Sequence, residues 1–442
     1  MAAWGASTID ASAAFYRQTD LVSDLPGTAQ VQDPQLVNPW GIVVPPTGPI
    51  RVSDNRTGVS TSYDGAGQPQ GPVIDISPVA GGTRPSAPTG IVFNPTLQFE
   101  IASGAPARFV FCTADGAISG WNPTVNPTAS ILMVDNSASS AVYKGLAIAA
   151  TGSPRIYATD FHAATVQAFD GTFHPVATVG FVDPVLPAGY SPFGISDLGG
   201  TLLITFAVRD ATGRDDIPGA GHGIVDQFGY DGSFQRRLVT GGHLDSPWGA
   251  VIAPAGFGDF AGDLLVANSG DGVINAFDFG TGAFVGTLRD EIGAPLTIPG
   301  LKGLAFGTGG LGGDPNTLYF AAGIPGSGGI GDHGLMGSIQ WVDGSASVEG
   351  RDRRSELLLR SGPVPARGTV RTSFDLPTGG VVRLGLFDVT GREVAVLTDR
   401  SFEAGRHEIR WNTRALGLPS GAYLLSLSGP AGNATARIPI LQ

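Results

Sequence analysis

Three oxygen-bearing side chains stand at the same position of a repeated apolar segment. Asp54, Asp160 and Asn268 end the segments "IRVSD", "IYATD" and "LLVAN". If these segments are arranged around an axis, equivalent positions fall on one circle, and the three side chains are expected to converge near a channel mouth. Carboxylate and amide oxygens suit a hard cation such as Ca²⁺. The sequence therefore predicts a metal site, while Asx turns at strand ends explain the same residues without one.

Further polar residues are expected on the same face of the repeat. Asn38, Lys144 and Lys302 stand where the chain reaches the innermost segments. Either lysine could neutralise converging carboxylates without a metal, so the six residues together form a candidate site for a small polar ligand. Two long loops, 207–223 and 323–337, are expected at the same mouth. They contribute Arg209, Asp210, Asp215, Asp216, His222, Asp332 and His333.

The loops also allow a catalytic alternative. An acidic residue beside His222 or His333 could exchange protons as acid and base, and a metal at the mouth would suit a hydrolase of the lactonase type. Such an enzyme should carry a Glu and several Asn or Asp residues on its innermost strands, whereas "GIVVPP", "GIVFNP", "GLAIAA", "GISDLG", "GAVIAP" and "GLAFGT" offer almost none. The sequence contains no G-x-S-x-G, H-E-x-x-H or C-x-x-C motif. The pattern favours binding over catalysis.

The elements that would position these residues come from a repeat. The phrase "LVNPWGIVV" at 36–44 returns as "YSPFGISDL" at 190–198 and as "DSPWGAVIA" at 245–253. Six glycines open apolar segments at separations of 49, 55, 49, 55 and 54 residues, namely Gly41, Gly90, Gly145, Gly194, Gly249 and Gly303. This spacing is typical of four-stranded propeller blades. The sequence predicts an all-β, six-bladed β-propeller, whose glycines let the innermost strands approach the axis. The aromatic residues before them, Trp40, Phe193 and Trp248, are expected to pack between adjacent blades.

The sixth unit lacks one strand. "LKGLAFGTG", "NTLYFAAG" and "GSIQWVDG" supply three strands, whereas the segment 14–23, "AFYRQTDLVS", reads as a strand without a unit of its own. We predict that this segment is the outer strand of the sixth blade, because pairing the two ends of the repeat closes the ring and covers two sheet edges. The propeller is therefore expected to span residues 14–345.

Composition and charge restrict the remaining function classes. The chain of 442 residues has a formal net charge of −12, which argues against a nucleic-acid partner because phosphates need a basic surface. No apolar run reaches the roughly 18 residues of a transmembrane helix, and no signal peptide is recognisable in the chain as given. The single cysteine, Cys112, is expected to be a buried apolar residue.

The combined motifs resemble a protein family. "LVNPWGIVV", "PTGIVFNPT", "DGAISGWNP", "RDDIPGAGHGIVDQF" and "HGLMGSI" together are similar to an uncharacterised bacterial family of exported six-bladed propellers, related to NHL-type blades. The resemblance spans residues 15–345. It implies the propeller fold and export, and it implies no catalytic residues.

The pattern changes after "DGSASVEGRDRRSE". A charged linker is expected over 346–356, followed by strands and turns over 357–442 that predict an immunoglobulin-like β-sandwich. "FDVTGREVAVL", "AGRHEIRWN" and "LPSGAYLLSL" resemble the FlgD-like Ig domain and the C-terminal sorting domain of type IX secretion. The resemblance implies recognition by secretion machinery and a secreted or cell-surface location.

Three functions stay open on the sequence alone. The first is an exported binding or interaction scaffold, for a small polar ligand or for a protein or glycan partner, with its C-terminal module used for export or tethering. The second is a metal-dependent lactonase-like or esterase-like hydrolase, with its site at the channel mouth. The third is a structural surface protein. The apolar innermost strands favour the first.

Overall fold

The chain forms two compact units, which meet in sequence between Ala346 and Ser347. The computed structural model describes residues 14–343, 358–362, 366, 368–376, 379–388, 392–429 and 432–440. The predicted linker, 346–356, lies outside the described residues.

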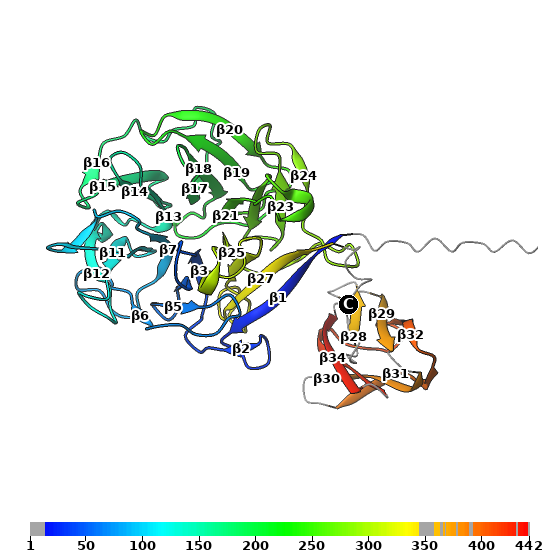
Figure 1. Cartoon of the computed structure of the whole chain (residues 1–442). Coiled ribbons are helices and arrows are strands. Elements are labelled where there is room, and N and C mark those ends of the chain that lie inside the picture. The colour runs from blue at the N-terminus through cyan, green and yellow to red at the C-terminus, as the bar shows by residue number, and fades with distance from the viewer. Residues whose placement is uncertain are drawn as a thin grey trace, which may run out of the picture. The chain divides into compact units, whose positions relative to one another are not determined.

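The first unit is a ring of six antiparallel sheets within residues 14–343 (Figure 1). Short strands with alternating apolar residues, separated by turns, favour this pairing. The innermost strands are β3 (Pro39–Val43), β7 (Pro88–Phe93), β13 (Tyr143–Ala149), β17 (Tyr190–Asp197), β21 (Pro247–Ile252) and β25 (Leu301–Phe306). The second strands are β4 (Ile50–Asp54), β10 (Phe109–Thr113), β14 (Arg155–Asp160), β18 (Leu202–Val208), β22 (Leu264–Asn268) and β26 (Leu318–Ala322). The predicted all-β, six-bladed architecture is confirmed.

The outer half of each blade consists of two further strands. The third strands are β5 (Val59–Tyr63), β11 (Ala117–Trp121), β15 (Thr165–Asp170), β19 (Ile224–Phe228), β23 (Ile274–Phe277) and β27 (Leu335–Val342). The fourth strands are β6 (Ile74–Asp75), β12 (Ile131–Asp135), β16 (Pro175–Val176), β20 (Phe234–Thr240), β24 (Phe284–Thr287) and β1 (Phe15–Ser23). In the sixth sheet β1 pairs in parallel with a fifth, short strand at the outer edge, β2 (Val31–Gln32). Minor elements are the hairpin β8 (Glu100–Ala102) and β9 (Ala105–Pro106), and the short 3₁₀ turns η1 (Ser137–Ser139), η2 (Gly258–Phe260) and η3 (Gly310–Gly312).

The N-terminal strand completes the sixth sheet. β1 pairs antiparallel with β27, from Phe15 opposite Val342 to Ser23 opposite Leu335. Tyr16 anchors the strand, because its hydroxyl donates a 3.0 Å hydrogen bond to the Phe257 carbonyl of the fifth blade. The last blade is thus assembled from both ends of the repeat, which pairs edges that would otherwise be open.

Every innermost strand carries a β-bulge at the same place. In the first blade Pro39 pairs with Asp54 and Ile42 with Val52, so that Trp40 and Gly41 together oppose one residue. The other five blades repeat this register shift. A bulge increases local twist and redirects the side chains at the bulged positions.

The glycine of each bulge packs against the innermost strand of the next blade. A Cβ atom on Gly41 would lie 2.6 Å from the carbonyl oxygen of Thr89, and one on Gly303 would lie 2.5 Å from that of Trp40. The second contact joins the sixth blade to the first and completes the circle. These glycines are therefore needed for close backbone approach around the axis, as the sequence predicted.

An apolar cluster fills each space between neighbouring blades of the first unit. Between the first and second blades, for example, Ile74 packs with Phe109 and Trp121. Each fully buried large side chain contributes about 1.5–3 kcal/mol. Cys112 is buried between the second and third blades, and burial raises the pKa of its thiol to about 11.

The second unit contains two antiparallel sheets around one core. The first sheet has the order β28 (Leu358–Gly362), β29 (Thr369–Leu376), β32 (Gly405–Asn412), and the second has the order β31 (Glu393–Phe402), β30 (Gly380–Asp388), β33 (Gly421–Gly429), β34 (Gly432–Ile440). Phe374 and Trp411 of the first sheet share a cluster with Leu384 and Leu425 of the second. Trp411 Nε1 donates to Thr372 Oγ1 at 2.9 Å.

No helix among the described residues is long and apolar enough to span a bilayer.

Candidate functional site at the channel mouth

Six side chains meet where the innermost strands begin. Each bulge consists of a glycine and the residue before it, so the six preceding residues occupy equivalent places around the axis. We call them the axial ring: Trp40, Thr89, Lys144, Phe193, Trp248 and Lys302. All are buried except Trp248, which is partly exposed. The ring therefore combines three aromatic side chains with two cations and one hydroxyl.

The aromatic members close the channel. The Trp40 ring centroid lies 6.1 Å from that of Phe193 and 6.0 Å from that of Trp248, both edge to face. These residues belong to the first, fourth and fifth blades, so Trp40 reaches across the axis to meet the other two. Edge-to-face pairs add about 0.5–1.5 kcal/mol beyond burial. The expectation that these aromatic residues pack between adjacent blades is corrected for Trp40, which contacts residues of non-adjacent blades, whereas Phe193 does pack against Phe161 of the adjacent third blade, with ring centroids 5.2 Å apart.

The two lysines of the axial ring flank the same indole. Lys144 Nζ lies 4.9 Å and Lys302 Nζ 4.7 Å from the centroid of Trp40. A cation within about 6 Å of an aromatic face is attracted by the ring's quadrupole. These are the only two lysines among the 26 basic residues of the sequence. The chain thus places both of its lysine amines, from the third and sixth blades, within 4.9 Å of one indole centroid.

Both amines are withdrawn from water. The exposed fraction is 4% for Lys144 and 5% for Lys302. Burial lowers the pKa of both ammonium groups, and that of Lys302 falls to about 8 although Asp216 and Asp215 oppose the change. The positive charge of Lys144 lowers the pKa of Lys302 further. Lys302 Nζ donates a 2.6 Å hydrogen bond to Ser269 Oγ.

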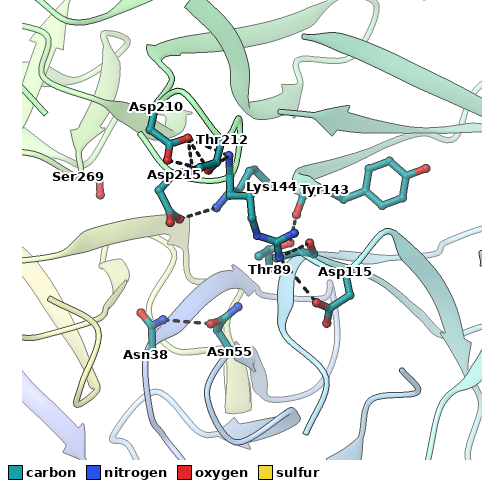
Figure 2. Close-up of polar contacts among 12 residues, drawn as sticks. Asn38, Asn55, Thr89, Asp115, Tyr143, Lys144, Asp210, Thr212, Asp215 and Ser269 are labelled. Atoms are coloured by element: carbon teal, nitrogen blue, oxygen red, sulfur yellow. Dashed lines mark hydrogen bonds and ion pairs between the residues drawn. The ribbon is translucent and has the colours of Figure 1, made fainter. Parts of the chain in front are cut away.

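Asp215 is the one described acidic residue that forms an ion pair with either lysine. Its Oδ1 atom lies 3.5 Å from Lys144 Nζ, as Figure 2 shows. The Asp215 side chain is 81% exposed, whereas that of Lys144 is 5% exposed. Water screens such an exposed partner, so the pair contributes little. The two buried charges are therefore only partly compensated.

Asp215 belongs to a short hairpin, residues 209–216, that follows β18 and that we call the acidic hairpin. A bridge between Arg209 and Asp216 forms its base. Asp210 closes the turn, because its backbone N–H donates to the Asp215 carbonyl at 2.8 Å and its Oδ1 accepts from the N–H of Arg214 at 3.0 Å. The sequence placed this loop at the mouth, and the structure puts its carboxylate beside Lys144.

The structure does not bring Asp54, Asp160 and Asn268 together as a metal site. They end the second strands of the first, third and fifth blades, and their polar contacts are local. Asp54 Oδ2 accepts hydrogen bonds from the N–H of Thr61 at 3.0 Å and from its hydroxyl at 2.8 Å. Burial raises the pKa of the Asp54 carboxyl well above its ordinary value, which makes it a poor cation ligand.

Asp160 and Asn268 also form hydrogen bonds with nearby groups of the propeller. Asp160 Oδ1 accepts from the N–H groups of Val142 and Ala163, both at 3.1 Å, and its Oδ2 accepts from Gln167 Nε2 at 3.0 Å. Asn268 Nδ2 donates to the His243 carbonyl at 2.8 Å. Each of the three side chains is thus bonded within its own part of the ring, although Asp54 Oδ1 and Asn268 Oδ1 are buried without a hydrogen-bond partner. Within residues 14–343 and the described parts of the second unit, no group of three or more His, Cys, Asp or Glu side chains could hold a metal.

Asn38 lies beside the axial ring and connects two blades. Its φ of 51° falls in the left-handed region, which asparagine adopts more readily than most residues. Asn38 Nδ2 donates to Asn55 Oδ1 at 3.1 Å (Figure 2), and Asn55 Nδ2 donates to the Pro88 carbonyl of the second blade at 3.2 Å. The predicted ligand residue Asn38 thus has a structural contact at the rim.

The loop histidines hold their loops in place. His222 Nδ1 lies 2.9 Å from the Ile217 carbonyl oxygen, and His333 Nδ1 lies 2.7 Å from Asp24 Oδ2. Asp332 pairs with Arg56 at 2.9 Å. These contacts stabilise the rim and provide no acid and base pair facing the axial ring.

The sequence predicted that the two lysines lie at the mouth, and it did not predict their contact with Trp40. Trp40 was expected to serve blade packing, and the indole's contact with both amines was not anticipated. Two signals were available in the sequence. Each member of the axial ring directly precedes a marker glycine, and lysine occurs only at two of those positions.

Two hollows adjoin the mouth. Inside the channel a cavity of about 330 Å³ is bordered by Trp248 and by apolar innermost-strand residues, which include Ile42, Ile91, Leu146, Ile195, Ala250 and Leu304. Ligand pockets begin at about 300 Å³. A second hollow of about 410 Å³ contains Asp115, Ser137, Ser140 and Arg214, and its lining is more polar. Because Arg214 belongs to the acidic hairpin, this hollow adjoins the hairpin.

Comparison with known proteins identifies relatives of the propeller. No family model matches the sequence. The uncharacterized protein R648 of Acanthamoeba polyphaga mimivirus is 34% identical over 295 residues, which cover 64% of this chain and 72% of the viral protein. The uncharacterized protein L690 of the same virus is 35% identical over 304 residues, which cover 66% of this chain and 79% of that protein.

Solved structures show a likeness of fold alone. Virginiamycin B lyase from Staphylococcus aureus has a TM-score of 0.43 at 12% identity and covers 74% of this chain and 100% of its own. A glucose dehydrogenase has a TM-score of 0.46 at 10% identity, with coverage of 73% and 98%. A nidogen/laminin complex gives 0.40 at 13% identity, with coverage of 61% and 83%.

The six radial sheets and their axial mouth define a six-bladed β-propeller. The chain belongs to the family of the mimivirus proteins R648 and L690. Its predicted relation to exported bacterial propellers stays a prediction.

Proposed function

We propose that this propeller binds a small anionic ligand at the axial ring, between Lys144 and Lys302. The proposal is carried by the placement of the chain's two lysines, which are both buried against the Trp40 indole. Ammonium groups in an apolar site are costly unless a negative charge compensates them. Asp215 compensates only in part because its side chain is mostly exposed. An anionic ligand would supply the remaining charge.

The polar groups at the ring are mainly hydrogen-bond donors. Trp40 Nε1 and Trp248 Nε1 are buried without a hydrogen-bond partner. Together with the two ammonium groups they suit a ligand rich in acceptor oxygens, such as a carboxylate or a phosphate. Lysine fits this place better than arginine, since a compact ammonium adjusts its pKa when buried and a guanidinium does not. The chain uses arginine at its other 24 basic positions.

The channel walls support binding over hydrolysis. The cavity inside the channel is bordered mainly by apolar side chains such as Ile91, Leu146 and Leu304. Its polar lining side chains, Ser196 and Asp197, are already hydrogen-bonded to the Ala250 carbonyl and the Tyr230 hydroxyl. The lactonase-like alternative depended on Asp54 and Asp160, whose hydrogen bonds are local. A binding role therefore explains both the burial of the two lysines and the mainly apolar channel walls.

The test is a titration of the full chain with acetate and with inorganic phosphate at constant ionic strength. Calorimetry should show binding to the wild type that is lost in Lys144→Met and in Lys302→Met. Arg56→Met is the matched control, because Arg56 pairs with Asp332 and stands outside the axial ring. The proposal is refuted if the wild type and both lysine variants bind the anions equally. It is also refuted if neither the wild type nor Asp215→Asn binds either anion.

We further propose that the C-terminal unit is an immunoglobulin-like module for export or surface tethering. Its two sheets and single core support the module, as do the motifs that resemble sorting domains. Fusion of residues 347–442 to a reporter, expressed in a host with type IX secretion, should carry the reporter to the surface or the medium. A reporter retained inside the cell envelope would contradict this role.

A further inference from the structure

We infer that Asp215 occupies the place of a ligand carboxylate, and that the acidic hairpin is a lid which a small carboxylate ligand displaces. The inference rests on the proposed anion binding and gives it a ligand class. It also assigns the hairpin, residues 209–216, a function in ligand exchange.

The ion pair between Lys144 and Asp215 is unequal. The amine is fixed in the buried ring, whereas the carboxylate reaches it from the solvent side with most of its surface exposed. The distance of 3.5 Å between Lys144 Nζ and Asp215 Oδ1 is long for a charge-assisted hydrogen bond, whose usual length is about 2.7–2.9 Å. The ion pair therefore stabilises the present position of Asp215 only weakly, and a carboxylate that lies closer to the amine can replace it.

The acidic hairpin is able to move as one piece. Asp210 accepts hydrogen bonds from Arg214 N at 3.0 Å and from Thr212 Oγ1. Its own N–H donates to the Asp215 carbonyl at 2.8 Å. These bonds lie inside the hairpin, so its turn keeps its shape when it leaves the lysine.

The contacts of the hairpin with the rest of the propeller differ between base and tip. At the base, Arg209 Nη1 donates a short bond of 2.6 Å to the His162 carbonyl. At the tip, Arg214 Nη2 lies 3.4 Å from the Ala114 carbonyl and 4.0 Å from Asp115 Oδ1. The Thr212 carbonyl oxygen at the tip also lies 3.1 Å from His162 Nδ1. Rotation about the base would release this contact together with the long contacts of Arg214 and Asp215, and would keep the short bond of Arg209.

A ligand carboxylate is free to approach both lysines, whereas Asp215 forms an ion pair with Lys144. Lys302 Nζ donates its hydrogen bond to Ser269 Oγ at 2.6 Å. A ligand carboxylate has two oxygens and no tether to a hairpin, so it can approach both ammonium groups beside Trp40. The gain in contact over Asp215 is the driving force for displacement.

The experiment compares acetate affinity in full-length wild type, Asp215→Asn and Asp332→Asn by calorimetry. Asp215→Asn removes the built-in competitor, so acetate should bind about 5–10-fold more tightly, as expected when the competent state becomes the major one. Asp332→Asn removes the same charge from the other long loop and should change acetate affinity by less than about twofold. Lys144→Met should abolish binding in combination with Asp215→Asn.

The outcomes separate the lid from the site itself. If Asp215→Asn binds acetate like the wild type while Lys144→Met does not bind, the anion site stands and the lid is refuted. Equal tightening in Asp332→Asn would show an effect of net charge, which also refutes the lid. If inorganic phosphate binds the Asp215→Asn variant more tightly than acetate does, the carboxylate class is wrong. Failure of every variant to bind either anion overturns both the lid and the proposed function.

Discussion

Lys144 Nζ lies 4.9 Å from the centroid of the Trp40 indole, although the two residues belong to the third and the first blade. Trp40 also contacts Phe193 and Trp248 edge to face. One side chain thus links the blades across the axis and stabilises a buried charge. Changes at this residue should alter both the stability of the ring and the properties of the lysines.

Trp40→Ala is expected to lower the free energy of unfolding by about 3–5 kcal/mol, since it leaves a cavity at the axis and removes the partner of both amines. Chemical denaturation of the full chain measures the change. Trp40→Phe keeps an aromatic ring and should cost less. An alanine variant within about 0.5 kcal/mol of wild type would be typical of a surface position and would contradict the axial role.

Lys302 should make stability depend on alkaline pH. Its pKa is about 8 in the folded protein against an ordinary value of 10.5, with Asp216, Asp215 and Lys144 as the charged groups that act on it. The unfolded chain binds more protons between these values, so the stability contributed by this group is present above pH 10.5 and is lost as the pH falls through 8. The stability of wild type relative to Lys302→Met should therefore rise across this interval. A constant difference in denaturation experiments would argue against a neutralised Lys302.

Asp226 should make the stability of the protein fall as the pH rises, which is opposite to the effect of Lys302. Arg237 Nε lies 3.4 Å from Asp226 Oδ1, and Asp183 contacts the same guanidinium. Burial, and then the charge of Asp183, raise the pKa of Asp226 from 3.8 to about 8. Stability from this group is complete below pH 3.8 and is lost as the pH rises through 8. As the pH rises from 3.8 to about 8, the wild type should lose more stability than Asp226→Asn. Parallel pH profiles of the two proteins would refute the assignment.

Calcium should leave thermal stability unchanged. Asp160 accepts hydrogen bonds from Val142, Ala163 and Gln167, so its oxygens are already used within the protein. Asp160→Ala is expected to cost about 1–3 kcal/mol because it leaves buried donors unpaired. Melting curves with Ca²⁺ and with a chelator provide the measurement. A rise of the melting temperature with Ca²⁺ that disappears in Asp54→Asn and Asp160→Asn would restore the metal site.

Deletion of residues 1–24 should destabilise the propeller, because β1 pairs with β27 along its length. The melting temperature falls by about 2–4 °C per kcal/mol in a domain of 150–250 residues and by less in a larger one, so a loss of a few kcal/mol should lower it by several degrees. Deletion of residues 1–13 is the control, since it keeps β1. Equal melting temperatures for both deletions would show that β1 does not contribute to stability.

The fold could be predicted because its signals are local. Strand alternation, turn residues and the spacing of Gly41, Gly90 and the later marker glycines are properties of short segments. The same spacing located Lys144 and Lys302 at the mouth, since both directly precede a marker glycine. The immunoglobulin-like identity of the C-terminal unit and its export role stay predictions.

The metal-site prediction depended on side-chain direction. Asp54 and Asp160 stand at equivalent strand ends, and equivalence was taken to mean convergence. The bulge changes the geometry, since it directs Trp40 and Lys144 to the axis while Asp54 and Asp160 form hydrogen bonds to their own third strands. A one-residue change of register decides which face a side chain occupies, and the sequence alone does not show where a bulge falls.

By itself, the sequence determined the number of blades, the glycines at the axis and the positions of the two lysines, because each follows from patterns within a single repeat. Only the tertiary structure decided that both amines meet one indole and that Asp215 is the carboxylate beside Lys144. These contacts join different blades, with Lys144 and Asp215 separated by 71 positions in the chain. Closure of the ring brings such residues together, and their burial then sets the charge balance that makes the mouth a candidate anion site.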